Sequence, residues 1–180
     1  MDIIDFSRHI GNFDPDPFMD FIRGLPDEAW DEFTDRQDRF EAHSRTKTLA
    51  AIFPDRKNFP DTELVTYTYT EAMRPFWDDL ARAFACFYGA EFIVTSAMVV
   101  QMPPQSEVLS HTDTHPYFGH THRARWCLSG DYKAMDFMIS GDKIPMKKGD
   151  FVEINNRMPH AVAYQGKVPR FNFIVDFLPV

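Results

Sequence analysis

The stretch RFNFIVDFL, residues 170–178, decides the fold class of this 180-residue chain. Side chains of an extended strand point alternately to its two faces. One face of this stretch carries three phenylalanines and a valine, and the other carries an arginine, an asparagine, an isoleucine and an aspartate. The aromatic face must be buried, so in a closed barrel the polar face lines the interior. Polar interiors in small barrels generally indicate a ligand site.

Six further segments between residues 91 and 166 are short, rich in β-branched and aromatic residues, and parted by Gly, Pro, Asn and Asp turns. They are EFIVTSAMVVQM (91–102), SEVLSHTD (106–113), RARWCLSG (123–130), MDFMISG (135–141), DFVEIN (150–155) and HAVAYQG (160–166). Helical patterns do not intervene. The sequence therefore predicts a mainly β protein with flanking helices, built as a double-stranded β-helix or jelly roll.

The length suits one domain, since 44% hydrophobic and 15% aromatic residues can fill a single core. We expect one domain over residues 1–180, with a helical cover over 1–62, a strand and a helix over 63–90, and the jelly-roll core over 91–180. In the middle part, ELVTYTYT (63–70) alternates like a strand. Apolar residues then recur at helical spacing up to Gly89, a residue type that often ends helices.

Charge and cysteine content restrict the partners and the compartment. A formal net charge of -8 disfavours a nucleic-acid partner, because affinity for phosphates comes from Lys and Arg. Two cysteines, Cys86 and Cys127, are too few for a disulfide framework and indicate a reducing compartment. The N-terminal residues lack a signal-peptide pattern, and no apolar run approaches the ~20 residues of a bilayer span. We therefore expect a cytoplasmic protein with neither a nucleic-acid nor a membrane partner.

His111 and Asp113 begin the candidate site. Two residues apart on an extended segment, their side chains project to one face and can share an ion. With His160 they form the two imidazoles and one carboxylate that suit a non-haem iron(II) oxygenase. Arg170, ten positions after His160, offers a planar fork for the far carboxylate of an oxo-acid cosubstrate. The pattern predicts iron(II), an oxo acid and dioxygen at a catalytic site.

A hairpin is expected to bring Arg170 back to the second histidine. Residues 165–167, Gln-Gly-Lys, are a turn candidate between two strand patterns. An odd-numbered loop centred on Gly166 would turn His160, Asn172 and Arg170 inward, whereas an even-numbered loop would turn Arg170 away.

The chain resembles the iron(II)/2-oxoglutarate dioxygenases related to aspartyl/asparaginyl β-hydroxylase. The matching stretches cover roughly the C-terminal half, in the family's order: HTDT (111–114), HRARWCL (122–128), GDFVEINNRMPHAVAY (149–164) and RFNFIVDFLP (170–179). The resemblance implies that His111, Asp113 and His160 bind iron and that Arg170 holds the C5 carboxylate of 2-oxoglutarate.

The resemblance also assigns pocket residues and departs from the founding hydroxylases at two positions. It implies that Arg125 and Met102 line the cosubstrate or substrate pocket, and Asn172 is the candidate for a hydrogen bond to a group beside the metal. Asp113 stands where the founding hydroxylases have glycine, and Cys127 where they have histidine. The Asp-bearing branch, which includes the free-proline cis-hydroxylases, is closer, and residues 35–53 also look similar to it.

We therefore expect a hydroxylase that acts on an amino acid of Asp/Asn or Pro type, free or within a peptide or protein, and converts 2-oxoglutarate to succinate. The alternative is a cupin-like metal-binding isomerase or a non-catalytic sensor, which has no need of Arg170. A structural accessory protein that kept its ligands is a third possibility, which the intact ligand set disfavours. The oligomeric state is left open.

Several neighbouring residues have two interpretations. The histidines of HPYFGH (115–120) and His122 lack cysteine partners, so a solvated, substrate-contacting loop is favoured over a zinc site. Arg123 and Arg125 share a face, and we expect Arg125 to point inward while a surface ion pair explains the other. Cys127 suits either a place near the metal or an apolar filler.

Two remaining stretches are interpreted structurally. Asn155 and Asn156 are expected to form a turn, because Asn tolerates left-handed dihedrals. His43 is structural unless the N-terminal segment covers the barrel mouth, in which case it reaches the pocket.

Overall fold

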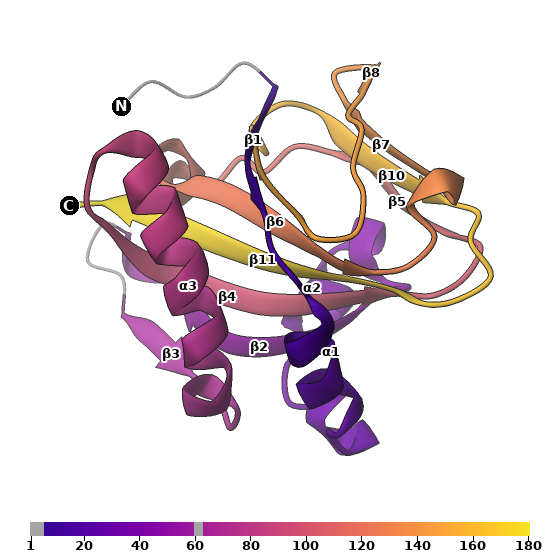
Figure 1. The fold of residues 1–180 in the computed structure, drawn as a ribbon, viewed down its shortest axis with the longest axis horizontal. Coiled ribbons are helices and arrows are strands. Elements are labelled where there is room, and N and C mark those ends of the chain that lie inside the picture. The colour runs from indigo at the N-terminus through magenta and orange to yellow at the C-terminus, as the bar shows by residue number, and fades with distance from the viewer. Residues whose placement is uncertain (1–5, 60–62) are drawn as a thin grey trace.

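Two antiparallel sheets face each other in the computed structural model, which describes residues 6–59 and 63–180 (Figure 1). The larger sheet has the order β1-β9-β6-β11-β4-β2-β3 and the smaller has the order β5-β10-β7-β8. The strands are β1 (Ser7–Asn12), β2 (Lys47–Pro54), β3 (Leu64–Thr66), β4 (Phe92–Met102), β5 (Ser106–His111), β6 (His122–Ser129), β7 (Met135–Ile139), β8 (Asp142–Lys143), β9 (Asp150–Ile154), β10 (His160–Tyr164) and β11 (Arg170–Pro179). Each of the seven predicted segments of the core contains a strand, so the jelly-roll prediction is confirmed.

Helices and short 3-10 turns connect and cover these strands. The α-helices are α1 (Asp16–Arg23), α2 (Asp35–Arg39) and α3 (Thr70–Tyr88). The 3-10 turns are η1 (Asp27–Trp30), η2 (Glu41–His43), η3 (Arg56–Asn58), η4 (Pro116–Gly119) and η5 (Tyr132–Ala134).

β11 lies inside the larger sheet, between β6 and β4, as its two-faced sequence predicts. On its aromatic face Phe173, Val175 and Phe177 are fully buried under helices, while Phe171 is partly buried. The Phe173 ring lies 4.8 Å from Phe18 of α1, and the Phe177 ring lies 4.3 Å from Phe84 of α3. Its polar face points toward the smaller sheet, where Arg170 is only 2% exposed. The aromatic core therefore lies outside the barrel wall, while a second apolar cluster, which includes Cys127, Phe137 and Val162, packs between the two sheets beside the polar groups.

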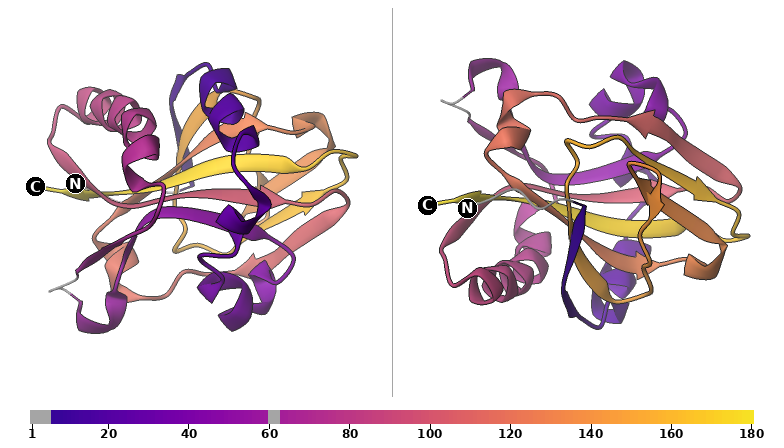
Figure 2. Two further views of the ribbon diagram at one scale, coloured as in Figure 1. Left: turned by 90° about the horizontal axis from the view of Figure 1, so that it is seen from below. Right: turned by 90° about the horizontal axis from the view of Figure 1, so that it is seen from above.

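α1 and α3 cover the outer face of the larger sheet (Figures 1 and 2). In α3, Met73, Trp77, Leu80 and Phe84 recur at three- and four-residue spacing and are all buried. Gly89 ends the helix with a left-handed φ of 61°, as predicted. The strand predicted over 63–70 is shorter than expected, because only Leu64–Thr66 pair with β2 and the helix already begins at Thr70.

The cover predicted over 1–62 is not purely helical, and this prediction is corrected. β1 pairs with β9, and β2 pairs with β4, so this region contributes two strands to the larger sheet. β2 is buried along most of its length, so its sequence is a continuous apolar run rather than an alternation. Residues 1–5 and 60–62 of the predicted cover lie outside the described residues.

The predicted hairpin between the second histidine and Arg170 is wrong. β10 pairs with β5 and β7 in the smaller sheet, whereas β11 pairs with β4 and β6 in the larger one. The intervening residues therefore cross from one sheet to the other. His160 and Arg170 still both point inward, because the inner faces of two opposed sheets look into the same space.

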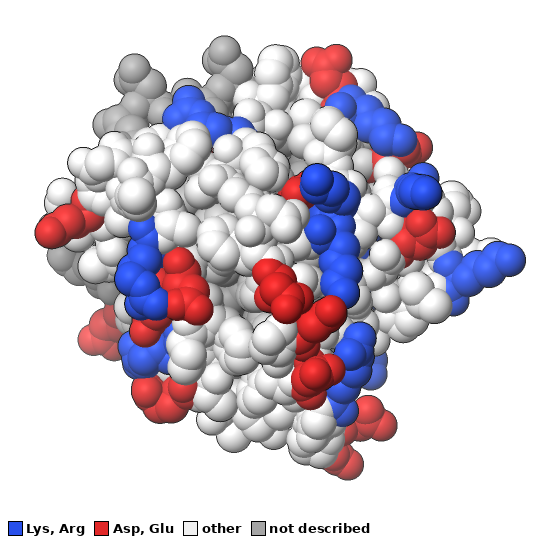
Figure 3. Space-filling model, in the orientation of Figure 1, with Lys and Arg blue, Asp and Glu red and all other residues white. Residues whose placement is uncertain are grey.

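Acidic and basic side chains intermingle over the face in Figure 3, where a continuous basic patch is not seen among the described residues. Along α3, Arg74 pairs with Glu71, and Arg82 pairs with Asp79. Among the described residues, no helix has the length and apolar character that a bilayer span requires.

The outer aromatic core generates a stability prediction. Phe18→Ala should lower the free energy of unfolding by about 3–5 kcal/mol, because the ring is fully buried among aromatic neighbours and a cavity would remain. Urea unfolding followed by tryptophan fluorescence measures the loss. Phe87→Ala on α3 is the control, since that ring is 46% exposed and its loss should cost far less. Equal losses in both variants would contradict this account of the core.

Candidate metal centre and anion pocket

His111, Asp113 and His160 converge inside the barrel, and one donor atom from each lies within 4.8 Å of the others. His111 ends β5, Asp113 follows in the next turn, and His160 begins β10. The two histidines are direct cross-strand partners, with ring centroids 4.3 Å apart. Residues from two distant stretches of sequence thus form one potential three-ligand group.

Both imidazoles are oriented by backbone carbonyls. Nδ1 of His111 lies 2.8 Å from the carbonyl oxygen of Leu109, and Nδ1 of His160 lies 3.0 Å from that of Met158. A carbonyl only accepts, so in each ring Nδ1–H donates and Nε2 keeps its lone pair for a metal. Burial lowers the pKa of His160 to about 4, so the ring is neutral at physiological pH.

Asp113 is held as a carboxylate by two donors on one oxygen. Its Oδ2 accepts from Nη1 of Arg123 at 2.6 Å and from Nδ2 of Asn156 at 2.7 Å. Burial by itself raises the pKa of Asp113, but the Arg123 charge and the Asn156 hydrogen bond outweigh it and lower the pKa to about 2. The second oxygen, Oδ1, remains available to an ion.

Sequence reasoning missed the parts played by Arg123 and Asn156. Arg123 is not a surface residue: it is 7% exposed and also donates to both carboxylate oxygens of the buried Asp176, at 2.7 and 2.8 Å. Asn156 lies in the predicted turn but is only 3% exposed. The signal for Arg123 was present, because alternation places it on the same inner face as Arg125.

A second group of polar atoms in the interior lacks partners. Arg170 donates through Nη1 to Sδ of Met102 at 3.4 Å, while its Nε and Nη2 have no hydrogen-bond partner among the described residues. Nε of Arg125 and Oδ1 of Asn172 are likewise buried and unpartnered. Burial and the nearby Arg170 lower the pKa of Arg125 to about 9. Since buried polar groups are normally satisfied, the arginine nitrogens indicate the place of an anionic ligand, whereas Oδ1 of Asn172 can only accept from a donor.

One cavity joins the two histidines of the metal centre to these arginines. It has about 530 Å³ of space, part of it open to solvent, and its lining includes His111, His160, Arg125, Arg170 and Asn172. The predicted metal ligands and the predicted cosubstrate residues are therefore brought together by the fold.

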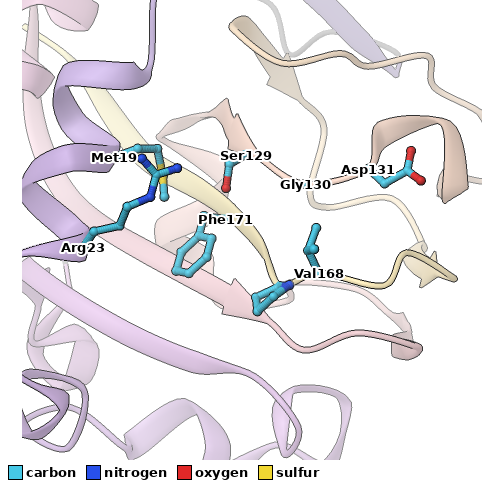
Figure 4. Close-up of a pocket in the computed structure, with 8 residues that line it drawn as sticks. Met19, Arg23, Ser129, Gly130, Asp131, Val168 and Phe171 are labelled. Carbon is cyan, nitrogen blue, oxygen red and sulfur yellow. The ribbon is translucent and has the colours of Figure 1, made fainter.

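A wider cleft of about 1000 Å³ lies elsewhere, between α1 and the loops around Gly130 and Val168 (Figure 4). Its lining offers Arg23 and Asp131 but no histidine. Gly130 separates this cleft from Arg170, since a Cβ at Gly130 would come within 2.9 Å of the Arg170 side chain. We therefore place the chemistry in the inner cavity.

The other candidate histidines do not join the metal centre. His122 lies on the outer face of β6, where its Nδ1 is 2.6 Å from a carboxylate oxygen of the buried Glu153. Nδ1 of His115 accepts from the amide of Tyr117 at 3.2 Å. The 115–120 loop is also anchored, since Tyr117 and Phe118 are buried. The interpretation of this segment as a solvated loop therefore holds for the exposed Pro116 and His120 but is wrong for Tyr117 and Phe118.

Cys127 lies on the inner face and is fully buried. Burial raises the pKa of its thiol to about 11, which keeps it protonated and suits an apolar filler.

The N-terminal segment covers the barrel mouth and adds Arg36, His43 and Thr46 to the cavity lining. The His43 ring lies edge-on to His111, with centroids 4.8 Å apart. Nη2 of Arg36 lies 3.2 Å from Nε2 of His43, and the guanidinium must be the donor. Burial lowers the pKa of His43 to about 2, so its ring is neutral. His43 was left open by the sequence, and Arg36 was not singled out within the 35–53 stretch.

No family model and no curated protein matches this sequence. Solved structures do share the fold. An oxidoreductase of the 2OG-Fe(II) oxygenase family from Burkholderia pseudomallei is 14% identical, with a TM-score of 0.58 over 74% of this chain and 67% of that chain. ThoJ, a non-heme monooxygenase in complex with nickel, is 15% identical, with a TM-score of 0.57 over 97% and 73%. SnoN, a non-heme alpha-ketoglutarate-dependent epimerase from nogalamycin biosynthesis, is 12% identical, with a TM-score of 0.51 over 86% and 73%. These similarities establish the fold alone.

The geometry predicts one divalent ion per chain. His160→Ala should lower the affinity for Mn(II) by about 100-fold or more, and Asn156→Ala by about 10-fold, because loss of a group that orients a ligand costs less than loss of the ligand. Equilibrium dialysis with metal analysis measures both. His120→Ala is the control, since its ring contacts Phe59 and not the three ligands. Undiminished Mn(II) binding by His160→Ala would refute the assignment.

Proposed function

We propose that the protein is an iron(II)- and 2-oxoglutarate-dependent oxygenase that hydroxylates a C–H bond of an amino acid, free or within a peptide or protein. One observation carries the proposal: the cavity that contains His111 and His160 also contains Arg170, a deeply buried guanidinium with two unpartnered nitrogens. A metal centre with an anion receptor beside it is what a chelating oxo acid requires.

The donor set suits ferrous iron. Two imidazole nitrogens and one carboxylate oxygen form the facial ligand group of non-haem iron(II) oxygenases and leave the remaining coordination positions open. His111, Asp113 and His160 would hold the ion. With 2-oxoglutarate bound, iron would supply oxygen activation coupled to decarboxylation of the oxo acid to succinate.

The residues of the chain position the reactants. Arg170 would hold the C5 carboxylate of 2-oxoglutarate, and Met102 fixes one edge of its guanidinium. Arg123 and Asn156 keep Asp113 ionised by donating to its Oδ2, so its Oδ1 would be the oxygen that binds the metal. Val108 and Val162 contribute apolar surface to the cavity lining. Little reorganisation is then needed when the ligands bind, which lowers the cost of the reaction.

The finer assignment rests on the resemblance to the aspartyl/asparaginyl β-hydroxylase-like proteins. Asp113 occupies the third ligand position, which favours hydroxylation over halogenation and matches the Asp-bearing branch. The 2OG-Fe(II) oxygenase from Burkholderia pseudomallei supports the same general chemistry on this fold. We also propose a cytoplasmic location and no nucleic-acid or membrane partner, in keeping with two free cysteines and the net charge of -8.

Anaerobic titration of 2-oxoglutarate into the Fe(II)-loaded protein tests this proposal. A visible charge-transfer band should appear, and oxygen should then yield succinate. Arg170→Met should weaken 2-oxoglutarate binding by about 10- to 100-fold, because a bidentate charge-assisted contact is lost. Arg23→Met is the control, since that arginine lines the outer cleft. If iron binds but the band is absent, the alternative of a cupin-like isomerase or sensor is favoured.

Gly130 supplies an independent test of the Arg170 position. Gly130→Ala should weaken 2-oxoglutarate binding while Mn(II) binding stays unchanged, because the new Cβ would come within 2.9 Å of the Arg170 Cβ and Cγ atoms. Gly141→Ala is the matched control: its φ is also positive, at 92°, but nothing lies within 4 Å of the new atom. Both substitutions place an alanine at a positive φ, which destabilises the folded protein. Only Gly130→Ala also displaces Arg170. Identical cosubstrate affinity in the two variants would contradict this prediction.

A further inference from the structure

Arg36 is a cation at the cavity without an anionic partner. It comes from α2 in the N-terminal segment and lines the same cavity as His111 and Arg170. Its Nη1 donates to Sδ of Met98 at 3.4 Å, and its Nη2 donates to His43 at 3.2 Å. Neither acceptor carries a negative charge.

The surroundings of Arg36 do not supply an anion from within the chain. Burial, with a further contribution from the nearby Arg123 charge, lowers the pKa of Arg36 to about 10. The two nearby carboxylates, Asp113 and Asp176, both accept from Arg123. Among the described residues that line the cavity there is no carboxylate at all. A partly buried guanidinium in this position therefore needs an anion from solution as its charged partner.

The cosubstrate does not account for this cation. Arg36 contacts Met98, whereas Arg170 contacts Met102, and both methionines belong to β4. Four residues of extended strand span about 13 Å, so the two guanidiniums attach to well-separated points of the cavity wall. A 2-oxoglutarate molecule with one carboxylate on Arg170 and the other toward the metal leaves Arg36 free.

Local packing fixes the orientation of Arg36. Nε2 of Gln37 donates to Oγ1 of Thr48 at 2.9 Å, which ties α2 to β2. The neutral His43 ring rests on His111 and accepts from the guanidinium. Arg36 is therefore held beside a metal ligand, at the mouth that the N-terminal segment covers.

We propose that Arg36, positioned by His43, binds a carboxylate of the substrate. This inference rests on the proposed function and narrows it: the substrate is a small molecule with a free carboxylate that enters the cavity. The lining contains arginines and no carboxylate, and the nearby Asp113 and Asp176 already accept from Arg123, so a substrate ammonium group has no free anionic partner there. The carboxylate is recognised, and an amino group is not required.

Binding to the Mn(II)- and 2-oxoglutarate-loaded protein, measured by calorimetry, tests the assignment without turnover. The probes are the free L-amino acids, their carboxamides, and the corresponding acids in which hydrogen replaces the amine. At least one amino acid and its deaminated acid should bind, and the carboxamide should bind about 10-fold more weakly or worse, since it lacks the charge. Arg36→Met should cause a similar loss for the acid, and Arg36→Lys should recover part of it.

Two controls separate this inference from the proposed function. Arg39→Met changes the same helix at an exposed arginine that pairs with Asp35, and should bind every probe as the unaltered protein does. The affinity of Arg36→Met for 2-oxoglutarate, measured first, should be unchanged.

Each contrary outcome has a distinct meaning. Failure of 2-oxoglutarate to bind the unaltered protein would overturn the proposed function, and this inference with it. With 2-oxoglutarate bound, three results would overturn the inference alone: no acid of the panel binds, a carboxamide binds as tightly as its acid, or Arg36→Met binds the acid undiminished. Loss of 2-oxoglutarate binding in Arg36→Met would instead assign Arg36 to the cosubstrate.

Discussion

The Arg123 guanidinium, shared between Asp113 and Asp176, is the interaction on which the interior depends. Asp113 follows β5 of the smaller sheet, while Arg123 and Asp176 belong to β6 and β11 of the larger one. The shared cation therefore ties the two sheets together at the candidate metal centre. Such a buried array costs desolvation and contributes little net stability, but removal of one member would leave an unpaired charge. Its main consequence is the fixed position of an ionised Asp113.

The fold tolerates these buried polar groups because most of its stability comes from apolar packing on the outer face of the larger sheet. α1 and α3 bury the aromatic face of β11 and the outer faces of its neighbours, in a core that contains Phe18, Phe84, Phe173 and Phe177. The space between the sheets can then hold unpartnered arginine atoms at a tolerable cost. The interior itself is divided between these polar groups and a second apolar cluster around Phe137 and Val162, and the polar part links the fold to its proposed chemistry.

The N-terminal segment contributes both to the larger sheet and to the lining of the cavity. β2 extends the larger sheet, and the residues before it place His43 against His111 and Arg36 in the cavity lining. A jelly-roll core alone would hold a metal and an oxo acid. The covering segment adds the group that we assign to the substrate, so substrate choice is the property most open to change by sequence variation outside the core strands.

The sequence by itself determined the alternating strands and the amphipathic α3, because periodicity is a local property. Ligand chemistry and the family resemblance also predicted the grouping of His111, Asp113, His160 and Arg170, although the contacts that form this group are long-range. Tertiary structure alone decided three matters. It placed β10 and β11 in different sheets, made Arg123 and Asn156 the hydrogen-bond donors to Asp113, and brought Arg36 to the cavity. Each is a long-range contact, and the sequence near one partner carries no signal about which distant residue satisfies a buried charge or hydrogen bond.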